Sequence, residues 1–304
     1  MGKTARRVLM SGGSGLIGSA FRRAAEKDGT GVTVLVRRHR LVRAGAVYWN
    51  PAKDEAAVHP MALEGYEALV HLNGASVARR WTEDYQKEIV ASRVRSTEAL
   101  CRSLRGVRQR PRVLLCASAV GIYGDRGDEV LVEENAAGRG FLAETCVAWE
   151  AAARAACELG IRVVHLRFGV VLSRKGGALG RMLPVFRWGL GGRLGSGGQW
   201  MSWISVRDAV RAMVFLMERE DLAGAFNLTA PNPVTNAEFS KALAGAVHRP
   251  AVWPAPAGLL QAVFGEMAGE TLLASQRALP QRLLQAGFRF EDEEIGAGLK
   301  ALLG

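Results

Sequence analysis

Cysteine is scarce in this 304-residue sequence, and its four copies show no Cys-x-x-Cys spacing. Cys101, Cys116, Cys146 and Cys157 fall in segments typical of helix or strand interiors. That placement favours buried free thiols over a disulfide framework or a zinc site. We therefore expect no bound metal.

Long apolar runs are also missing. No stretch reaches the roughly 18 uninterrupted apolar residues that a membrane-spanning helix needs. The first residues, MGKTARRVLM, lack the apolar core of a signal peptide. We therefore expect a cytoplasmic protein with no membrane partner.

Acidic residues are outnumbered, with 29 Asp and Glu against 40 Lys and Arg and a net charge of +11. The basic runs RRHRLVR, RSLRGVRQRPR and SRKGG are scattered and have no interleaved aromatic residues. They do not match a nucleic-acid reader motif, so no nucleic-acid partner is expected. A solvated basic surface, which could serve to attract an anionic, phosphorylated ligand, fits this charge better.

Short apolar runs alternate with helix-periodic segments along most of the chain. The runs are RVLMSG, VTVLVRR, ALVHLNG, RVLLCASA, RVVHLRFGVVL and GAFNLTA. Strands that are apolar almost throughout and alternate with helices predict an α/β fold, a Rossmann-type doubly wound parallel sheet. We expect this domain to span residues 1–175, with 204–230 returning to it. Residues 176–203 and 231–304 are expected to form a smaller, partly helical C-terminal domain on the substrate side.

The stretch GGSGLIG follows the first predicted strand and opens the first predicted helix. Gly12 permits a tight turn, Gly15 lets the backbone approach a pyrophosphate, and Gly18 allows close packing of helix on strand. The alternative is a chance cluster in a chain with 36 glycines. The position between strand and helix favours a dinucleotide cradle made of Gly12, Gly13, Ser14, Gly15, Leu16, Ile17 and Gly18.

The end of the second predicted strand indicates which dinucleotide binds. It carries Arg37 and Arg38, where an NAD enzyme usually places an acid for the ribose hydroxyls. A guanidinium can grip a 2′-phosphate with two hydrogen bonds. NADP is therefore the favoured cofactor and NAD the less favoured one, with a solvent-exposed basic turn as the alternative interpretation.

Several longer motifs resemble the extended short-chain dehydrogenase/reductases. More narrowly, the chain resembles their atypical "epimerase family" branch, which includes the human family 39U member and bacterial proteins once described as cell-division inhibitors. The final segment resembles a C-terminal domain of unknown function found in that branch. The motifs cover nearly the whole chain and include SGGSGLIG, ASAVGIYGD, LRFGVVLSRKGGALGRMLPVFRWGLGGRLGSGGQWMSWISVRDAV and FGEMAGETLLASQRALPQRLLQAGFRF.

The resemblance implies further cofactor contacts. VHLNGA is similar to the turn against the adenine and ribose, which implies Leu72 and Asn73. KEIVASRV is similar to a helix that brings Glu88 and Arg93 to the cofactor side, and LRFGVV implies Val170 beside the nicotinamide. Leu72 and Val170 could equally be core residues, and Glu88 with Arg93 could be a surface pair on the helix.

The Tyr-x-x-x-Lys pair that handles the proton in these reductases is absent. The resemblance places Cys146 at the tyrosine position and Glu150 at the lysine position. A carboxylate raises the pKa of a neighbouring acid where an ammonium lowers it, so the usual dyad cannot operate. Ser118 and Tyr123 are the remaining candidate catalytic hydroxyls, and the alternative is that both are structural.

The substrate side offers only general signals. GSGGQWMSWISVRD supplies Gln199, Trp200, Ser202 and Trp203 with Asp208 nearby, which could line a small-molecule pocket or simply pack in a core. We therefore expect an NADP-binding oxidoreductase or epimerase acting on an unidentified small molecule. The alternative is a non-catalytic, dinucleotide-sensing regulator, and a homo-oligomer stays open.

Overall fold

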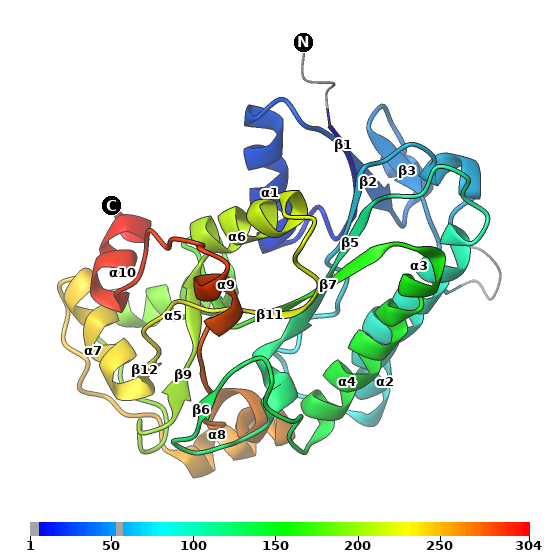
Figure 1. The fold of residues 1–304 in the computed structure, drawn as a ribbon. Helices are drawn as coiled ribbons and strands as arrows, with labels where there is room; N and C mark the ends of the chain where they lie inside the picture. Colours follow the sequence, from blue (N-terminus) through cyan, green and yellow to red (C-terminus); the bar gives the residue numbers. More distant parts are fainter. Residues whose placement is uncertain (1–5, 53–56) are drawn as a thin grey trace.

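A seven-stranded parallel sheet forms the centre of the molecule (Figure 1). The computed structural model describes residues 6–52 and 57–304. The strand order is β11-β7-β5-β4-β1-β2-β3. These strands are β1 (Arg7–Ser11), β2 (Gly31–Val36), β3 (Ala46–Tyr48), β4 (Ala68–His71), β5 (Val113–Ala119), β7 (Arg162–Phe168) and β11 (Gly224–Leu228).

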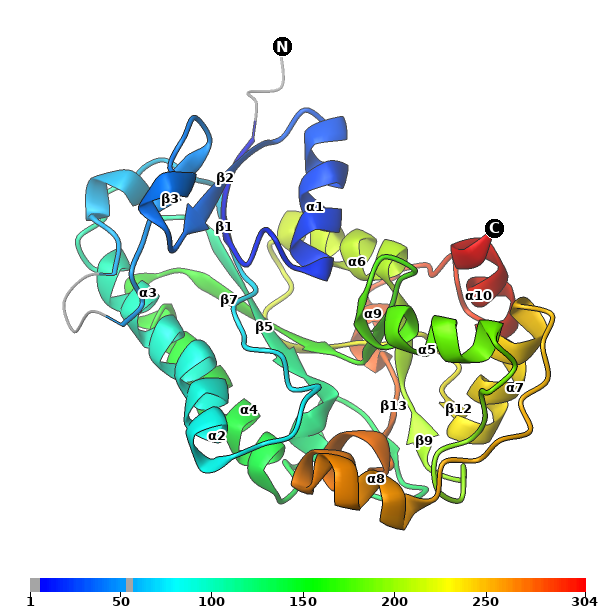
Figure 2. The ribbon, with the colours of Figure 1, turned by 180° about the vertical axis from the view of Figure 1, so that it is seen from behind.

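Helices cover both faces of this sheet, as Figures 1 and 2 show from opposite sides. One face carries α1 (Leu16–Lys27) and α6 (Val206–Glu218), and the other carries α2 (Glu83–Val90), α3 (Ser96–Leu104) and α4 (Phe141–Arg154). Because both faces are covered, the central strands are apolar on both sides, and every residue of β4 is buried. The predicted Rossmann-type doubly wound fold is confirmed.

One predicted strand divides in two. The run RVVHLRFGVVL forms β7 as far as Phe168, and β8 (Val170–Leu172) then leaves the sheet to pair with β10 (Trp203–Ser205). The separating residue is Gly169, where a Cβ atom would lie 2.5 Å from the carbonyl oxygen of Ser202. The division therefore follows from a close backbone approach that only glycine permits.

The helical segment from Glu83 to Leu104 is interrupted by a π-helical turn. The turn, Ala91–Arg95, joins α2 to α3. The Thr82 hydroxyl caps the start of α2 by accepting a hydrogen bond from the Tyr85 amide at 3.2 Å. The π turn rotates the residues that follow it relative to an uninterrupted helix.

A second, smaller core lies beside the carboxyl ends of the strands. It contains Leu172, Leu183, Trp203, Phe239 and Leu299, among others. The elements on this side are α5 (Gly177–Arg187), β9 (Trp200–Met201), β12 (Val234–Thr235), α7 (Asn236–Ala246), α8 (Ala257–Phe264), α9 (Gln281–Gln285) and α10 (Ile295–Leu303), together with β6 (Val130–Leu131) paired to β13 (Arg277–Ala278). The exact domain boundaries stay a prediction.

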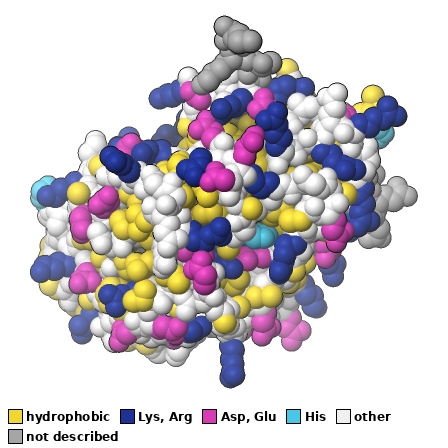
Figure 3. All heavy atoms as spheres, viewed as in Figure 1, with side chains coloured by type: hydrophobic (Ala, Val, Ile, Leu, Met, Phe, Trp, Pro, Cys, Tyr) yellow, Lys and Arg dark blue, Asp and Glu magenta, His cyan; other side chains and the backbone are white. Residues whose placement is uncertain are grey.

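The surface charge is dispersed on the face drawn in Figure 3. Lys and Arg side chains alternate there with Asp and Glu side chains and with apolar patches. Within the described residues, no helix combines the length and apolar character that crossing a bilayer requires.

Candidate functional site

The glycine loop connects β1 to α1 at the carboxyl edge of the sheet. Gly12 has a φ of +72°, and a Cβ atom there would lie 2.5 Å from the carbonyl oxygen of Leu72. At Gly18 a Cβ atom would lie 2.3 Å from the carbonyl oxygen of Gly12. At Gly15 it would meet only that same oxygen, at 3.3 Å, so the outer side of the loop is open. This arrangement matches the expected roles of the three glycines.

A cavity of about 710 Å³ opens beside this loop. Gly12, Gly13, Ser14 and Asn73 line one side of it, and the end of β2 with the following turn lines the other. Five arginines border the same space, whereas Glu26 is the one carboxylate in its described lining. The five are Arg22, Arg37, Arg38, Arg40 and Arg43. Such a concentration of guanidinium groups suits a phosphate dianion.

Three members of this set, Arg22, Arg40 and Arg43, were not predicted as cofactor residues from the sequence. Arg22 is the least expected of them. It lies on α1, nine positions after Gly13 in the chain, and its Cδ atom would lie 3.3 Å from a Cβ atom at Gly13. Its Nε is buried with no hydrogen-bond partner among the described residues, and its Nη2 reaches Glu26 only at 3.5 Å. Arg40 and Arg43 belong to the basic run RRHRLVR, which also supplies Arg37 and Arg38, whereas no neighbouring motif singles out Arg22.

A second cavity, of about 690 Å³, shares Gly12, Ser14, Arg37 and Asn73 with the first, so the two adjoin. The structure therefore brings many of the predicted cofactor residues to one groove. Those that line it are Gly12, Gly13, Ser14, Gly15, Arg37, Arg38, Leu72, Asn73 and Glu88.

Other predicted cofactor residues do not line these two cavities. Leu16 packs toward Gly177, where a Cβ atom would lie 3.0 Å from its Cδ2. Ile17 packs against the main core, and Gly18 is buried. Val170 begins β8, outside the main sheet, and packs against the second core. Because β7 ends at Phe168, Val170 follows the end of a sheet strand closely, and its contact with the nicotinamide stays a prediction.

Glu88 and Arg93 have different surroundings, although they were predicted together. Glu88 is exposed and forms an ion pair with Arg79 at 3.5 Å. Arg93 lies on the π turn and donates hydrogen bonds to the carbonyl oxygens of Ala75 at 3.0 Å and Ile89 at 3.2 Å. Its guanidinium also lies over the ring of Trp149, so it ties α4 to the loop after β4.

The two candidate catalytic hydroxyls belong to a buried polar network. Ser118 donates to Glu150 at 2.7 Å, and Tyr123 donates to Asn227 at 2.8 Å. Arg167 joins the two halves: it binds Glu150 with two hydrogen bonds, at 2.8 and 3.0 Å, and donates to the Tyr123 hydroxyl at 3.0 Å. Tyr123 is fully buried, so its hydroxyl is enclosed by protein groups.

The electrostatics of this network explain why Glu150 is ionised. Burial alone raises the pKa of Glu150, but hydrogen bonds and charge attraction from Arg167 outweigh burial and hold that pKa below its ordinary value. Burial raises the pKa of Tyr123 despite the nearby Arg167. Both Tyr123 and Ser118 are thus held as neutral hydrogen-bond donors, which favours structural roles for them.

The thiol at the tyrosine position is also enclosed. Cys146 is 4% exposed, and burial raises the pKa of its thiol to about 11. A thiol needs to lose its proton to act as a nucleophile, and at neutral pH this one keeps it.

Two of the residues for which pocket lining and core packing were both open hold the C-terminal segment in place. Gln199 donates to the carbonyl oxygen of Leu272 at 2.9 Å, and Ser202 donates to that of Gln276 at 2.7 Å. Trp200 donates to Asp128 at 2.8 Å. Trp203 is completely buried. Ser202 and Trp203 therefore have the core role that was the alternative interpretation, whereas Gln199 and Trp200 are only partly buried.

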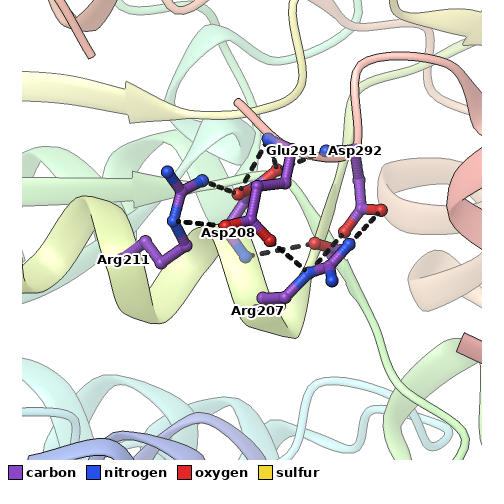
Figure 4. A network of polar contacts seen from close by, with 6 residues as sticks. Arg207, Asp208, Arg211, Glu291 and Asp292 are labelled. Carbon is purple, nitrogen blue, oxygen red and sulfur yellow. Dashed lines mark hydrogen bonds and ion pairs between the residues drawn. The ribbon is translucent and has the colours of Figure 1, made fainter. Parts of the chain in front are cut away.

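Asp208 has a similar anchoring role (Figure 4). Its buried carboxylate, on the first turn of α6, accepts hydrogen bonds from the amides of Glu291 and Asp292 and pairs with Arg211. Arg207 binds the Asp292 carboxylate at 2.8 Å. The contacts fix the segment before α10 against the helix that covers the sheet.

Comparison with known proteins places these features in a family. The profile of the NAD dependent epimerase/dehydratase family matches residues 8–229, and that of a domain of unknown function, DUF1731, matches residues 255–302. The chain is 45% identical over 293 residues to the "Epimerase family protein Mb2239" of Mycobacterium bovis, covering 96% of both chains.

Two solved structures share the architecture at sequence identities above 30%. The crystal structure of the human epimerase family protein SDR39U1 with NADPH superimposes with a TM-score of 0.88 at 34% identity, covering 98% of this chain and 99% of that one. A protein described as a nucleoside-diphosphate sugar epimerase from Corynebacterium glutamicum gives a TM-score of 0.82 at 33% identity, covering 99% of this chain and 59% of that one. With its glycine loop, parallel sheet and matching profile, this chain belongs to the NAD dependent epimerase/dehydratase family.

Proposed function

We propose that this protein is an NADP(H)-dependent oxidoreductase or epimerase of the atypical short-chain dehydrogenase/reductase type, acting on a small molecule in the cytoplasm. The observation that carries the proposal is the groove that begins at the glycine loop and ends among five arginines. The human relative that was crystallised with NADPH supports the same cofactor.

The residues of the groove fit this cofactor in two places. The open side of Gly15 leaves room for the pyrophosphate. The amides at the start of α1 can donate hydrogen bonds to it, because a helix N-terminus presents unpaired N–H groups. Arg37 and Arg38, with Arg22 beside them, can hold the 2′-phosphate that distinguishes NADP from NAD. When bound, the nicotinamide supplies or accepts a hydride.

The proton chemistry must differ from that of relatives with a tyrosine and lysine dyad. Glu150, at the lysine position, forms an ion pair with Arg167. The hydroxyls of Ser118 and Tyr123 are enclosed by protein groups and donate to Glu150 and Asn227. This network also favours a second candidate function, a regulator that binds the dinucleotide without turning it over. The two candidates share the cofactor and differ in turnover.

Fluorescence titration with NADPH and NADH tests the cofactor assignment. The wild type is expected to prefer NADPH, and Arg37→Asp should lose that preference, since one charge-assisted hydrogen bond is worth roughly 1.5–3 kcal/mol, or about 10–150-fold. Arg105→Asp, an exposed site on the helix end of α3, is the matched charge control. Equal affinity of the wild type for both dinucleotides would contradict the assignment.

Turnover separates the two candidate functions. Purified protein with bound NADPH is incubated with panels of carbonyl compounds and nucleoside-diphosphate sugars, and NADPH oxidation and sugar isomers are measured. Turnover of any panel member supports the enzyme, whereas tight binding with no turnover supports the regulator.

A further inference from the structure

A ridge of exposed apolar side chains lies outside the dinucleotide groove. It consists of Val185, Trp188, Leu190, Val252 and Trp253, which we call the apolar ridge. Trp188 is 81% exposed and Trp253 63% exposed, and they are the two tryptophans among the exposed large apolar residues of the described chain. A large aromatic ring left this open to water indicates a contact surface.

Two chain segments build the ridge side by side. The first is the end of α5 with residues 188–192, and the second is the stretch of residues 249–254 between α7 and α8 (Figure 2). The Trp253 amide donates to the carbonyl oxygen of Gly191 at 3.3 Å, and the Arg249 guanidinium donates to that of Arg187 at 3.1 Å. The two segments that carry these exposed side chains are therefore adjacent.

The charge beside the ridge has one sign. A cavity of about 600 Å³, which shares Val252 with the ridge, is lined by Arg193, Lys241 and Arg249 and by no carboxylate of the described chain. All three cations are exposed and form no ion pair with a described residue. The sequence itself has no Asp or Glu in residues 159–207 or 239–265, the two stretches that supply the ridge and most of the cavity.

We propose that this face binds the surface of an anionic phospholipid membrane. Trp188 and Trp253 would enter the interface between headgroups and acyl chains, where tryptophan is favoured, and the three cations would bind lipid phosphates. A second copy of this chain fits the face poorly, because a two-fold contact would bring the same cations together in a protein with a net charge of +11. The contact is peripheral and needs no spanning helix. It therefore departs from the expectation of no membrane partner, which rested on the lack of a spanning segment and of a signal peptide.

Vesicle co-sedimentation tests the proposal. The full-length protein is mixed at low salt with phosphatidylcholine vesicles or with vesicles that also contain phosphatidylserine. Three variants are compared with the wild type: Trp188→Ser with Trp253→Ser, Arg193→Ala with Lys241→Ala and Arg249→Ala, and a control that removes three exposed cations elsewhere, Arg23→Ala with Lys27→Ala and Arg105→Ala. NADPH affinity, measured in parallel, checks that each variant keeps its fold, because the ridge and its cavity do not line the groove.

The wild type is expected to sediment with the anionic vesicles and not with the neutral ones. The tryptophan variant and the variant that lacks Arg193, Lys241 and Arg249 should each bind the anionic vesicles at least tenfold more weakly. The control variant should bind them as the wild type does. Absence of wild-type binding would overturn the proposal, and so would unchanged binding by the tryptophan variant. An equal loss in the control variant would also overturn it, since overall charge would then explain the attraction.

Discussion

Replacing Glu150 by glutamine tests how much the buried ion pair with Arg167 stabilises the fold. The substitution keeps the shape of the side chain and one acceptor for Ser118, but removes the charge that pairs with Arg167 across 2.8 and 3.0 Å. Glu150 is only 7% exposed and Arg167 8%. Removing one partner of a buried ion pair typically costs about 3–5 kcal/mol, because the other charge is left without compensation.

We expect the lower end of that range, about 3 kcal/mol, because the amide oxygen of glutamine still accepts a hydrogen bond. The free energy of unfolding, from urea titrations at neutral pH, measures the loss. NADPH affinity should stay unchanged, because Glu150 does not line the groove. A decrease in the free energy of unfolding below about 1 kcal/mol would refute the reasoning, because a buried guanidinium without a compensating charge destabilises the fold by more than that.

The pH dependence gives an independent check. The folded pKa of Glu150 lies below its ordinary value of 4.5, so the pair stabilises the protein above that value and loses its effect as pH falls through the folded pKa. The stability gap between wild type and Glu150→Gln should therefore narrow in acid. The paired change Glu150→Leu with Arg167→Met should lower the free energy of unfolding less than Glu150→Gln alone, because neither charge of the pair is left without its partner.

Three further predictions follow from single side chains. Arg22→Leu should raise the Kd for NADPH about tenfold and leave the Kd for NADH unchanged, because it removes one cation from the proposed 2′-phosphate site. Arg23→Leu, at an exposed position on the same helix, is the control, and an equal rise in the NADPH Kd for both variants would contradict the assignment. Gly140→Ala should lower the free energy of unfolding by about 1–3 kcal/mol, measured by thermal or urea unfolding. The reason is that φ is +107° there and a Cβ atom would lie 2.8 Å from the Glu270 carboxylate that caps α4. Gly269→Ala, with open space around it, is the control and should leave the free energy of unfolding unchanged. Burial lowers the pKa of His71 to about 3, so below about pH 6.5 the unfolded chain binds a proton at this histidine that the folded chain does not. Between pH 7 and 5 the free energy of unfolding of the wild type should therefore fall by about 2 kcal/mol more than that of His71→Asn. Equal pH dependence of the two unfolding free energies would disprove this.

Features set by near neighbours in the chain were predictable from the sequence. The glycine loop shows itself through its spacing between a strand and a helix, and the sheet shows itself through short apolar runs that must be covered on both faces. β3 was missed because three residues, Ala46–Tyr48, are too few to show a period. The break at Gly169 had a signal, a glycine inside a strand pattern, which the apolar residues around it concealed.

The partners of buried charges were not predictable in the same way. Arg22 reaches the groove because α1 turns it toward Gly13, and Arg167 reaches Glu150 because β7 lies under α4. Both contacts depend on how elements pack in space, and a helix or strand period says only which residues share a face. The sequence could therefore show that the dyad was absent, but it could not show what replaced it.

The replacement has a consequence for any attempt to restore the dyad. A lysine at position 150 would bring its ammonium to the place where the Arg167 guanidinium now meets a carboxylate. Two buried cations at that separation repel each other, so Cys146→Tyr with Glu150→Lys should unfold more readily than the wild type and gain no reductase activity. Adding Arg167→Glu places opposite charges together again and should recover part of the lost free energy of unfolding. If the double variant were as stable as the wild type without this third change, the ion pair would not be what joins this helix to the strand.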